Sequence, residues 1–320
     1  MDKKVNNKKK IWPKVLISIL VVIAIIGTGG YFYIHSKLNK MDKVEVDKSD
    51  LGISDELTST YDKSKKITNI ALFGVDAPDG ETGRSDSIMI ATIDSVHNKL
   101  KLTSIMRDSY VNIPGHGLDK INHAYAFGGP QLAIKTINEN FGLNITDFMT
   151  VNFSSLPIII DALGGVDISI TDEEVPHIPG LSYAGTYTLT GEQALAYSRI
   201  RYAEGGDYKR TERQRTVLEG LFSKALSMPA SSYMSTLDTV LPYIQTNMSS
   251  RDILSLGTKA LTSFNGQLEQ QRFPLDGYCE GAMIDGIYYL TFDAETTKQQ
   301  FMGKNRIRFA IDCKSSGFSI

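Results

Sequence analysis

The sequence has little of the residues and motifs that mark several common functional classes. It contains only two Cys, Cys279 and Cys313, no CxxC pair, and five dispersed His, so the pattern does not suggest a thiolate or histidine metal site. Neither GxxxxGK[ST] nor a strand-linked GxGxxG occurs, so no nucleotide-binding loop is recognised. The net charge of -2 gives no overall attraction to nucleic acid or to anionic membranes. Any anion site must therefore come from a local cluster of Arg or Lys.

One long apolar run is present, at the N-terminus. Val15–Ile34 is a 20-residue stretch without a charged residue, about 30 Å long as a helix, which is enough to cross a bilayer core. Six Lys precede it, whereas fewer Lys follow and these alternate with acids, so the positive-inside rule predicts a cytoplasmic N-terminus. We expect an uncleaved single-pass anchor in the cell membrane, with the rest of the chain outside. A cleaved signal peptide is the alternative, but the run is longer than a usual signal-peptide core.

The remaining chain divides by composition. We expect residues 1–14 to form a basic cytoplasmic tail, 15–34 the transmembrane anchor, and 35–66, which are polar and mixed in charge, an extracellular stalk. Residues 67–302 would form the main folded domain and 303–320 a polar tail. Both Cys would lie outside the cell, where a disulfide can form, although Cys313 falls in the tail and the pairing stays open.

Three strands are predicted at the start of the domain. They are Ile67–Val75, Ser87–Ile93 and Lys99–Met106, and the polar turn before the third favours a hairpin between the second and third strands. If the first strand also pairs antiparallel, the three form a meander.

The meander has a chemical consequence. Asp76 ends the first strand, Asp86 begins the second and Arg107 follows the third, so all three would lie at one edge of the sheet. Residues 77–85 would form a loop at that edge.

Helices and further strands are predicted beyond residue 125. The expected helices are Pro130–Phe141 ending at Gly142, Leu156–Leu163 capped by Ser154, a helix through Ala194–Ser198 capped by Thr190, and Thr211–Leu226; the expected strands are Phe148–Phe153 and Val166–Ile170. This alternation predicts an α/β fold, a sandwich with helices flanking a mixed, partly antiparallel central sheet.

Two carboxylates at one sheet edge suit a hard divalent cation. Mg²⁺ prefers one or two carboxylates together with phosphate oxygens and water, so Asp76 and Asp86 are candidate ligands. The alternative is structural, because Asp76 can cap a turn and Asp86 can pair with Arg84.

A dense group of arginines follows. Five Arg occur within residues 199–215, and converging guanidinium groups bind a pyrophosphate through forked hydrogen bonds. In an extended segment Arg199 and Arg201 would share one face, and Arg210, Arg213 and Gln214 would share one face of a helix. Taken singly, each Arg is better explained as a solvated surface group, and only the dense run favours a binding site.

These motifs carry a resemblance to a known family. LFGVD, GRSDSIMIATID, SIMRDSYVNIPG, KINHAYAFGG, DALGGVDI, LTGEQALAYSRIRY and DYKRTERQ occur in that order. The chain closely resembles the LytR-CpsA-Psr family over about Ile67–Leu226. The resemblance implies a phosphotransferase that moves an anionic glycopolymer, such as teichoic acid or capsule, from undecaprenyl pyrophosphate to the C6 hydroxyl of peptidoglycan N-acetylmuramic acid. The implied partners are this lipid-linked donor, the peptidoglycan acceptor and membrane lipid, and not nucleic acid.

The resemblance also implies roles for individual residues. Asp76 and Asp86 would bind Mg²⁺, and Asp207, Arg107 and Arg199 would be catalytic, with Asp207 a base for the acceptor hydroxyl. The residues that would hold the pyrophosphate are Arg84, Arg107, Arg199, Arg201, Arg210 and Gln214. A prenyl tunnel between sheet and helices is implied, and Phe127, Ile159, Ile160 and Leu163 are either its lining or ordinary core. The family often has an Arg soon after GVD and a Pro before the RD motif, where this chain has Pro78 and Met106.

Two other functions remain open from the sequence. A pyrophosphatase acting on prenyl pyrophosphates would use the same metal and arginines with water as the nucleophile. A non-catalytic lipid-binding or regulatory module would bind the lipid without turnover.

Overall fold

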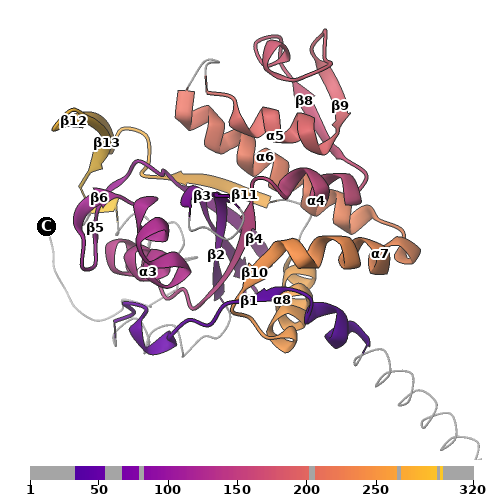
Figure 1. Ribbon diagram of the computed structural model, residues 1–320, viewed down its shortest axis with the longest axis horizontal. Coiled ribbons are helices and arrows are strands. Elements are labelled where there is room, and N and C mark those ends of the chain that lie inside the picture. Colours follow the sequence, from indigo (N-terminus) through magenta and orange to yellow (C-terminus); the bar gives the residue numbers. More distant parts are fainter. Residues whose placement is uncertain are drawn as a thin grey trace, which may run out of the picture.

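A mixed α/β fold surrounds one large sheet. The computed structural model describes residues 33–54, 67–78, 83–201, 206–264, 268–293 and 296–297. Its largest sheet has the order β1-β10-β7-β2-β3-β4-β11 (Figure 1). These strands are β1 (Asp42–Lys43), β2 (Ile67–Asp76), β3 (Arg84–Asp94), β4 (Lys99–Ile105), β7 (Asp147–Asn152), β10 (Ile244–Thr246) and β11 (Leu268–Phe273). The predicted mixed central sheet flanked by helices is confirmed.

Six further α-helices and three hairpins make up most of the rest of the described chain. The helices are α3 (His123–Phe141), α4 (Leu156–Ala162), α5 (Gly191–Arg199), α6 (Gly206–Ser227), α7 (Ala230–Val240) and α8 (Ser250–Ser263). The hairpins pair β5 (Tyr110–Ile113) with β6 (Gly117–Lys120), β8 (Val166–Ile170) with β9 (Gly185–Leu189), and β12 (Cys279–Ile284) with β13 (Ile287–Phe292).

The predicted meander is present. β2 pairs antiparallel with β3, and β3 pairs antiparallel with β4. The later strands β7 and β11 then add parallel to β2 and β4, which makes the sheet mixed. Antiparallel pairing therefore brings together the last residue of β2, the first residues of β3 and the last residue of β4 at one edge, as the sequence predicts.

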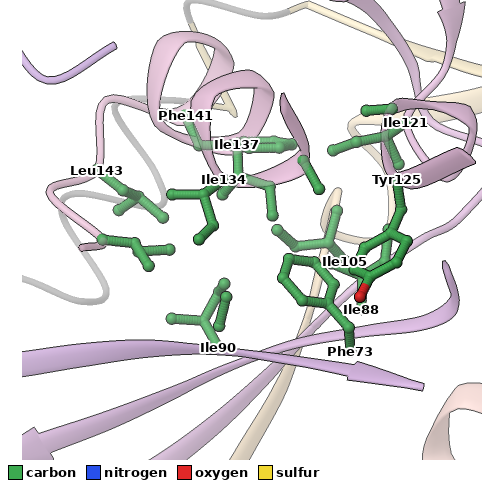
Figure 2. Packing of buried hydrophobic residues seen from close by; sticks show 14 of the residues in the cluster. Phe73, Ile88, Ile90, Ile105, Ile121, Tyr125, Ile134, Ile137, Phe141 and Leu143 are labelled. Carbon is green, nitrogen blue, oxygen red and sulfur yellow. The ribbon is translucent and has the colours of Figure 1, made fainter. Parts of the chain in front are cut away.

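One face of the sheet carries the main hydrophobic core. Alternate residues of β2 and β3, including Phe73, Ile88 and Ile90, point toward α3, whose Ile134 and Ile137 pack down onto them (Figure 2). This period-two alternation follows from the strand geometry. The other face of the sheet is covered by α4, α5 and α6, which also pack with β8 and β9 into a second core (Figure 1).

The helix boundaries differ from the predictions at three places. α3 begins at His123, and non-helical Gly128 and Gly129 separate its first turn from the predicted segment that starts at Pro130. The N-cap of α4 is Ser155 rather than Ser154. α6 begins at Gly206, one turn before the predicted Thr211. The predicted cap of α5 is confirmed, because Thr190 accepts a hydrogen bond from Gln193 N in a reciprocal capping box.

The segment predicted as a stalk packs on the domain over its described part. Leu38, Met41 and Leu51 are buried, and β1 adds to the edge of the sheet beside β10. Residues 38–53 are therefore part of the folded unit, and only residues 55–66 of the predicted stalk lie outside the described chain. The sequence missed this because these apolar residues are isolated and show no period.

The other predictions for the ends of the chain lie mostly outside the described residues. This applies to residues 1–14, to all but the last two residues of the Val15–Ile34 anchor, and to the tail at 303–320. Among the helices of the described ranges, none is both long and apolar enough to span a membrane. Cys279 lies half-buried at the start of β12, whereas Cys313 lies outside the described residues, so the question of their pairing stays open.

Candidate active site

Asp86 and Arg107 form the centre of a polar site at the shared sheet edge. Arg107 Nη1 lies 2.7 Å from Asp86 Oδ1, and both side chains are mostly buried. Burial alone would raise the pKa of the Asp86 carboxyl, but the charge and hydrogen bond of Arg107, with the charges of Arg210 and Arg201, lower it below its ordinary value. Asp86 is therefore held as a carboxylate that faces arginines.

A β-bulge sets the direction of the Asp86 side chain. Val75 pairs with Ser85 and Gly74 pairs with Ser87, so Asp86 is the extra residue on β3. Such a bulge re-aims a side chain relative to the regular pleat. Gly83, just before β3, permits the close pairing that follows, because a Cβ at this position would lie 2.4 Å from the Asp76 carbonyl oxygen.

The N-terminus of α6 supplies the next two groups. Asp207 Oδ1 lies 3.0 Å from Arg210 Nε and 3.7 Å from Arg107 Nη2, so Asp207 sits between two arginines. Arg210 also donates to the Asp86 carbonyl oxygen at 3.3 Å. Burial and the like charges of Arg107 and Arg201 outweigh the carboxylates and lower the pKa of Arg210 to about 10. An anion bound here would offset that repulsion, and a helix N-terminus favours one.

Arg199, Arg201 and Arg84 lie around this centre. Arg199 Nη2 lies 3.5 Å from Asp76 Oδ1, and its guanidinium stacks on Phe153 with 5.6 Å from Cζ to the ring centroid. Arg201 is exposed, and its charge acts on both Asp86 and Arg210. Arg84 is exposed at the start of β3, where its backbone pairs with Asp76. The extended segment predicted for Arg199 and Arg201 is wrong at Arg199, because α5 ends at that residue.

Arg213 does not join the site. Its Nε lies 2.7 Å from Glu174 Oε1 in a buried pair, and its Nη1 donates to the Ile200 carbonyl oxygen at 3.3 Å. Its hydrogen bond holds the backbone between Arg199 and Arg201. The prediction that Arg210, Arg213 and Gln214 act from one helix face is therefore wrong for Arg213, whose neighbours belong to the second core.

An apolar cavity opens beside these arginines. It has a volume of about 280 Å³ and lies between the sheet face opposite α3 and helices α4, α5 and α6. Its lining residues are almost all apolar, and they include Met89, Val151, Phe153, Ile159 and Leu218. The polar exceptions are Ser87, Ser198 and Gln214, which follow Asp86, precede Arg199 and follow Arg210 along the chain. The cavity and the arginine cluster are therefore adjacent.

The cavity sorts the four residues that the sequence left as tunnel or core. Ile159 lines the cavity, whereas Ile160 and Leu163 pack in the second core. Phe127 is 47% exposed and stacks on His116, with ring centroids 4.4 Å apart, so it belongs to neither the cavity nor the core.

Helix α6 arranges the site along its length. Asp207, Arg210, Gln214, Val217 and Leu221 follow one another at helical spacing, and the last three line the cavity. The separation from Asp207 to Leu221 is about 21 Å along the helix axis. One face of α6 thus runs from a carboxylate through a guanidinium and an amide to an apolar wall.

Asn122 is a site residue that the sequence analysis did not single out. It is almost fully buried, its Nδ2 lies 3.4 Å from Asp86 Oδ1, and its Oδ1 has no hydrogen-bond partner among the described residues. Its position within the KINHAYAFGG motif was the available signal, but the motif gave no role.

The protein supplies only part of the set of ligands that Mg²⁺ requires. Asp76 is exposed and Asp86 has one oxygen engaged by Arg107, and the described ranges contain no group of three or more His, Cys, Asp or Glu that could hold a metal ion. Two carboxylates with the remaining positions left to phosphate oxygens and water match the preference of Mg²⁺. The residues therefore fit a metal that arrives with a phosphorylated substrate.

Comparisons with known proteins agree with this geometry. A profile of the LytR_cpsA_psr family matches residues 27–306. Two relatives named polyisoprenyl-teichoic acid–peptidoglycan teichoic acid transferase TagU, from Oceanobacillus iheyensis and Enterococcus faecalis, are each 34% identical; the alignments cover 93% and 94% of this chain and 95% and 99% of the relatives. The chain belongs to the LytR-CpsA-Psr family.

Solved structures of similar proteins contain ligands. TagT bound to LIIa-WTA aligns with a TM-score of 0.64 and 30% identity, over 76% of this chain and 92% of that chain. The family protein YwtF (TagT) with bound octaprenyl pyrophosphate lipid aligns with a TM-score of 0.59 and 28% identity, over 76% and 92% of the two chains.

Proposed function

We propose that this protein is a phosphotransferase that moves a teichoic acid or a related anionic glycopolymer from an undecaprenyl-pyrophosphate-linked donor to the C6 hydroxyl of peptidoglycan N-acetylmuramic acid. The observation that carries this proposal is the arginine cluster beside an apolar cavity. A prenyl pyrophosphate has the same two parts, a doubly charged head and a long apolar chain. The names of the TagU relatives and the lipid in the TagT structure support the same substrate class.

The donor would bind with its prenyl chain in the cavity and its pyrophosphate among Arg84, Arg107, Arg199, Arg201 and Arg210. Guanidinium forks suit phosphate oxygens, and their charges would stabilise the negative charge that develops on the leaving group. Gln214 stands between the two regions on α6 and would contact the donor where head and chain join.

The chemical step would be an in-line displacement at the phosphorus nearest the sugar. The muramyl C6 oxygen forms a bond to that phosphorus while the bridging oxygen leaves with undecaprenyl phosphate. Asp207 would accept the hydroxyl proton, and a base in this role contributes about 10²- to 10⁴-fold. Arg107 and Arg210, which flank Asp207, fix its carboxylate.

Mg²⁺ would be held by Asp76 and Asp86 together with the donor phosphates, and it would supply further neutralisation of charge on the pyrophosphate. Asn122 and Arg107 both hydrogen-bond Asp86 Oδ1, so the protein itself orients this carboxylate.

The N-terminal sequence supports attachment to the outer face of the cell membrane, with the N-terminus in the cytoplasm. Protease added to intact protoplasts should then remove the domain. Protection of residues beyond 40 until the membrane is permeabilised would contradict this orientation.

The activity is tested by incubating the full-length protein in detergent with a lipid-linked teichoic acid donor and uncrosslinked peptidoglycan oligomers, followed by mass spectrometry. The proposal predicts a phosphodiester-linked conjugate and undecaprenyl phosphate in equal amounts. Undecaprenyl phosphate with hydrolysed polymer and no conjugate would identify a pyrophosphatase, and donor binding without any product would identify a binding module.

A further inference from the structure

The hairpin β12–β13 is attached directly to the catalytic edge. Leu290 N donates to the Asp108 carbonyl oxygen at 2.8 Å, and Leu290 forms an isolated bridge with Ser109. These contacts fix the hairpin to the segment that directly follows Arg107. In Figure 1 it projects on the side of the sheet away from α4, which is one wall of the apolar cavity.

One face of this hairpin is turned toward Asp207. Residues directly opposite one another in the pair share a face, and on this face Met283 pairs with Tyr288. At the other end of the same face, Cys279 Sγ lies 3.9 Å from the hydroxyl of Tyr208, the neighbour of Asp207. Burial raises the pKa of the Tyr288 hydroxyl, and the charges of Asp108, Asp207 and Cys279 add to this effect, so the hydroxyl lies near enough to both carboxylates to be influenced by their charge.

The Tyr288 ring forms an open platform. Tyr288 is 46% exposed and Met283 is 66% exposed. The ring lies across Gly281, where a Cβ would approach it to 2.7 Å. The platform is thus made by the absence of a side chain at Gly281 and by the exposed ring above it.

The charge of the hairpin disfavours a polyanion as its ligand. Residues 279–292 contain Glu280 and Asp285 and no Lys or Arg. Close by, Asp108 is paired with Lys120 and Asp207 with Arg210, and Arg272 stacks over the Tyr208 ring at 3.8 Å. The hairpin itself therefore offers no cation to a polyanion such as the donor glycopolymer. A weakly charged sugar chain fits instead, because the apolar face of a pyranose ring packs on an aromatic ring while its hydroxyls reach carboxylates.

The reaction geometry gives the direction of approach. In an in-line displacement the attacking and leaving oxygens lie on opposite sides of the phosphorus. The leaving group is attached to the prenyl chain, which the cavity would hold from Gln214 onward along α6. The attacking hydroxyl therefore comes from the Asp207 end of α6, where Tyr208 contacts the hairpin.

We propose that the β12–β13 face formed by Gly281, Met283 and Tyr288, with Tyr208, binds the acceptor glycan strand and presents its hydroxyl to Asp207. This inference rests on the proposed function, and it names the surface that recognises the second substrate. Tyr288 contacts the sugar and is not itself a catalytic residue.

The test is a direct binding titration of the full-length protein with a peptidoglycan-derived oligosaccharide, in the absence of donor. Tyr288→Ala should weaken binding about three- to tenfold, as expected for the loss of one ring contact, and Tyr288→Phe should retain it. Gly281→Ala should also weaken binding, because the added methyl group displaces the end of the Tyr288 side chain without crowding the backbone. Tyr183→Ala, at a remote tyrosine that is 78% exposed, is the matched control and should bind like wild type.

Unchanged affinity in both Tyr288→Ala and Gly281→Ala would overturn the inference, as would Tyr288-dependent binding of a poly(glycerol phosphate) fragment in place of the sugar. The half-saturating acceptor concentration in the transfer reaction should rise in the same two variants while that of the donor stays constant. Tyr288-dependent sugar binding without transfer by wild type would reject the proposed function alone. Transfer with an unchanged acceptor requirement in both variants would reject the inference alone.

Discussion

Arg107 Nη1 lies 2.7 Å from Asp86 Oδ1, so the carboxylate proposed for the metal and a guanidinium proposed for the pyrophosphate are hydrogen-bonded to each other. The two residues are 21 positions apart in the sequence and come from the ends of neighbouring strands. The pair links a proposed metal ligand to a proposed pyrophosphate ligand, and each side chain can be substituted separately.

Asp86→Asn should abolish Mg²⁺-dependent transfer while leaving the fold intact. The amide keeps the shape and a hydrogen-bonding oxygen but loses the charge that a hard cation needs. Asp76→Ala should also abolish transfer, because it removes the second carboxylate proposed for Mg²⁺. Its fold should stay intact, because Asp76 is exposed at a strand end rather than in the core. Transfer rates measured with Mg²⁺ and with excess chelator check this. Full activity in either variant, or turnover unaffected by chelator, would remove the two-carboxylate site.

Acid should remove the contribution of Asp86 to stability. The folded pKa of Asp86 is below its ordinary value of 3.8, so the native state binds its proton less readily than the unfolded chain does. The stabilisation is present above the ordinary value and is lost as the pH falls through the folded pKa. Wild type should therefore exceed Asp86→Asn in free energy of unfolding at about pH 6, and the gap should narrow toward about pH 3. A constant gap would show that Arg107 does not favour the charged carboxylate.

The buried pair of Arg213 and Glu174 should contribute to the stability of the fold and not to binding of the donor. Glu174→Ala leaves a buried guanidinium without its partner, which costs on the order of 3 to 5 kcal/mol. Thermal and denaturant unfolding measure this loss, and Glu173→Ala, at the exposed neighbour, should be close to wild type. Folded Glu174→Ala protein should retain donor affinity within a factor of about three; a larger loss would place Arg213 in the site through its hold on Ile200.

Filling the cavity should shorten the prenyl chain that the protein accepts. Val151→Phe would add bulk to the sheet wall of the cavity. Displacing about two methylene groups at about 0.8 kcal/mol each should weaken binding of a long prenyl pyrophosphate roughly tenfold. Geranyl pyrophosphate, which fills less of the cavity, should bind almost as before, and Val96→Phe on the surface turn after β3 is the control. Equal losses for long and short chains would contradict the assignment of the cavity.

The sheet edge was predictable because its signals are local. Short apolar runs and a polar turn predicted β2, β3 and β4, and antiparallel pairing then brings Asp76, Asp86 and Arg107 together. The bulge at Asp86 was not predictable, because Ser85, Asp86 and Ser87 are all polar and show no alternation that an extra residue could shift.

The rest of the site depends on contacts between distant segments. Helical spacing placed Arg210 and Arg213 on one side of α6, but only the neighbouring Glu174 decides that Arg213 turns away. The return of β11 to pair with β4, and the docking of the β12–β13 hairpin beside Asp108, join segments more than 150 residues apart. The resemblance to the family implied a prenyl tunnel, but only the structure separated Ile159, which lines the cavity, from Ile160 and Leu163 in the second core.

We assign the arginines beside the cavity to the donor pyrophosphate, which they would hold through forked hydrogen bonds. Arg199→Lys, Arg201→Lys and Arg210→Lys each keep the charge and lose the fork, at a cost on the order of 1.5 to 3 kcal/mol for a charge-assisted hydrogen bond. The most direct measurement is the affinity of full-length protein for undecaprenyl pyrophosphate at fixed salt, with Arg251→Lys on the exposed surface of α8 as the matched control. This assignment predicts that each of the three variants binds roughly tenfold more weakly or worse, while Arg251→Lys binds like wild type. Wild-type affinity in all three variants would contradict it.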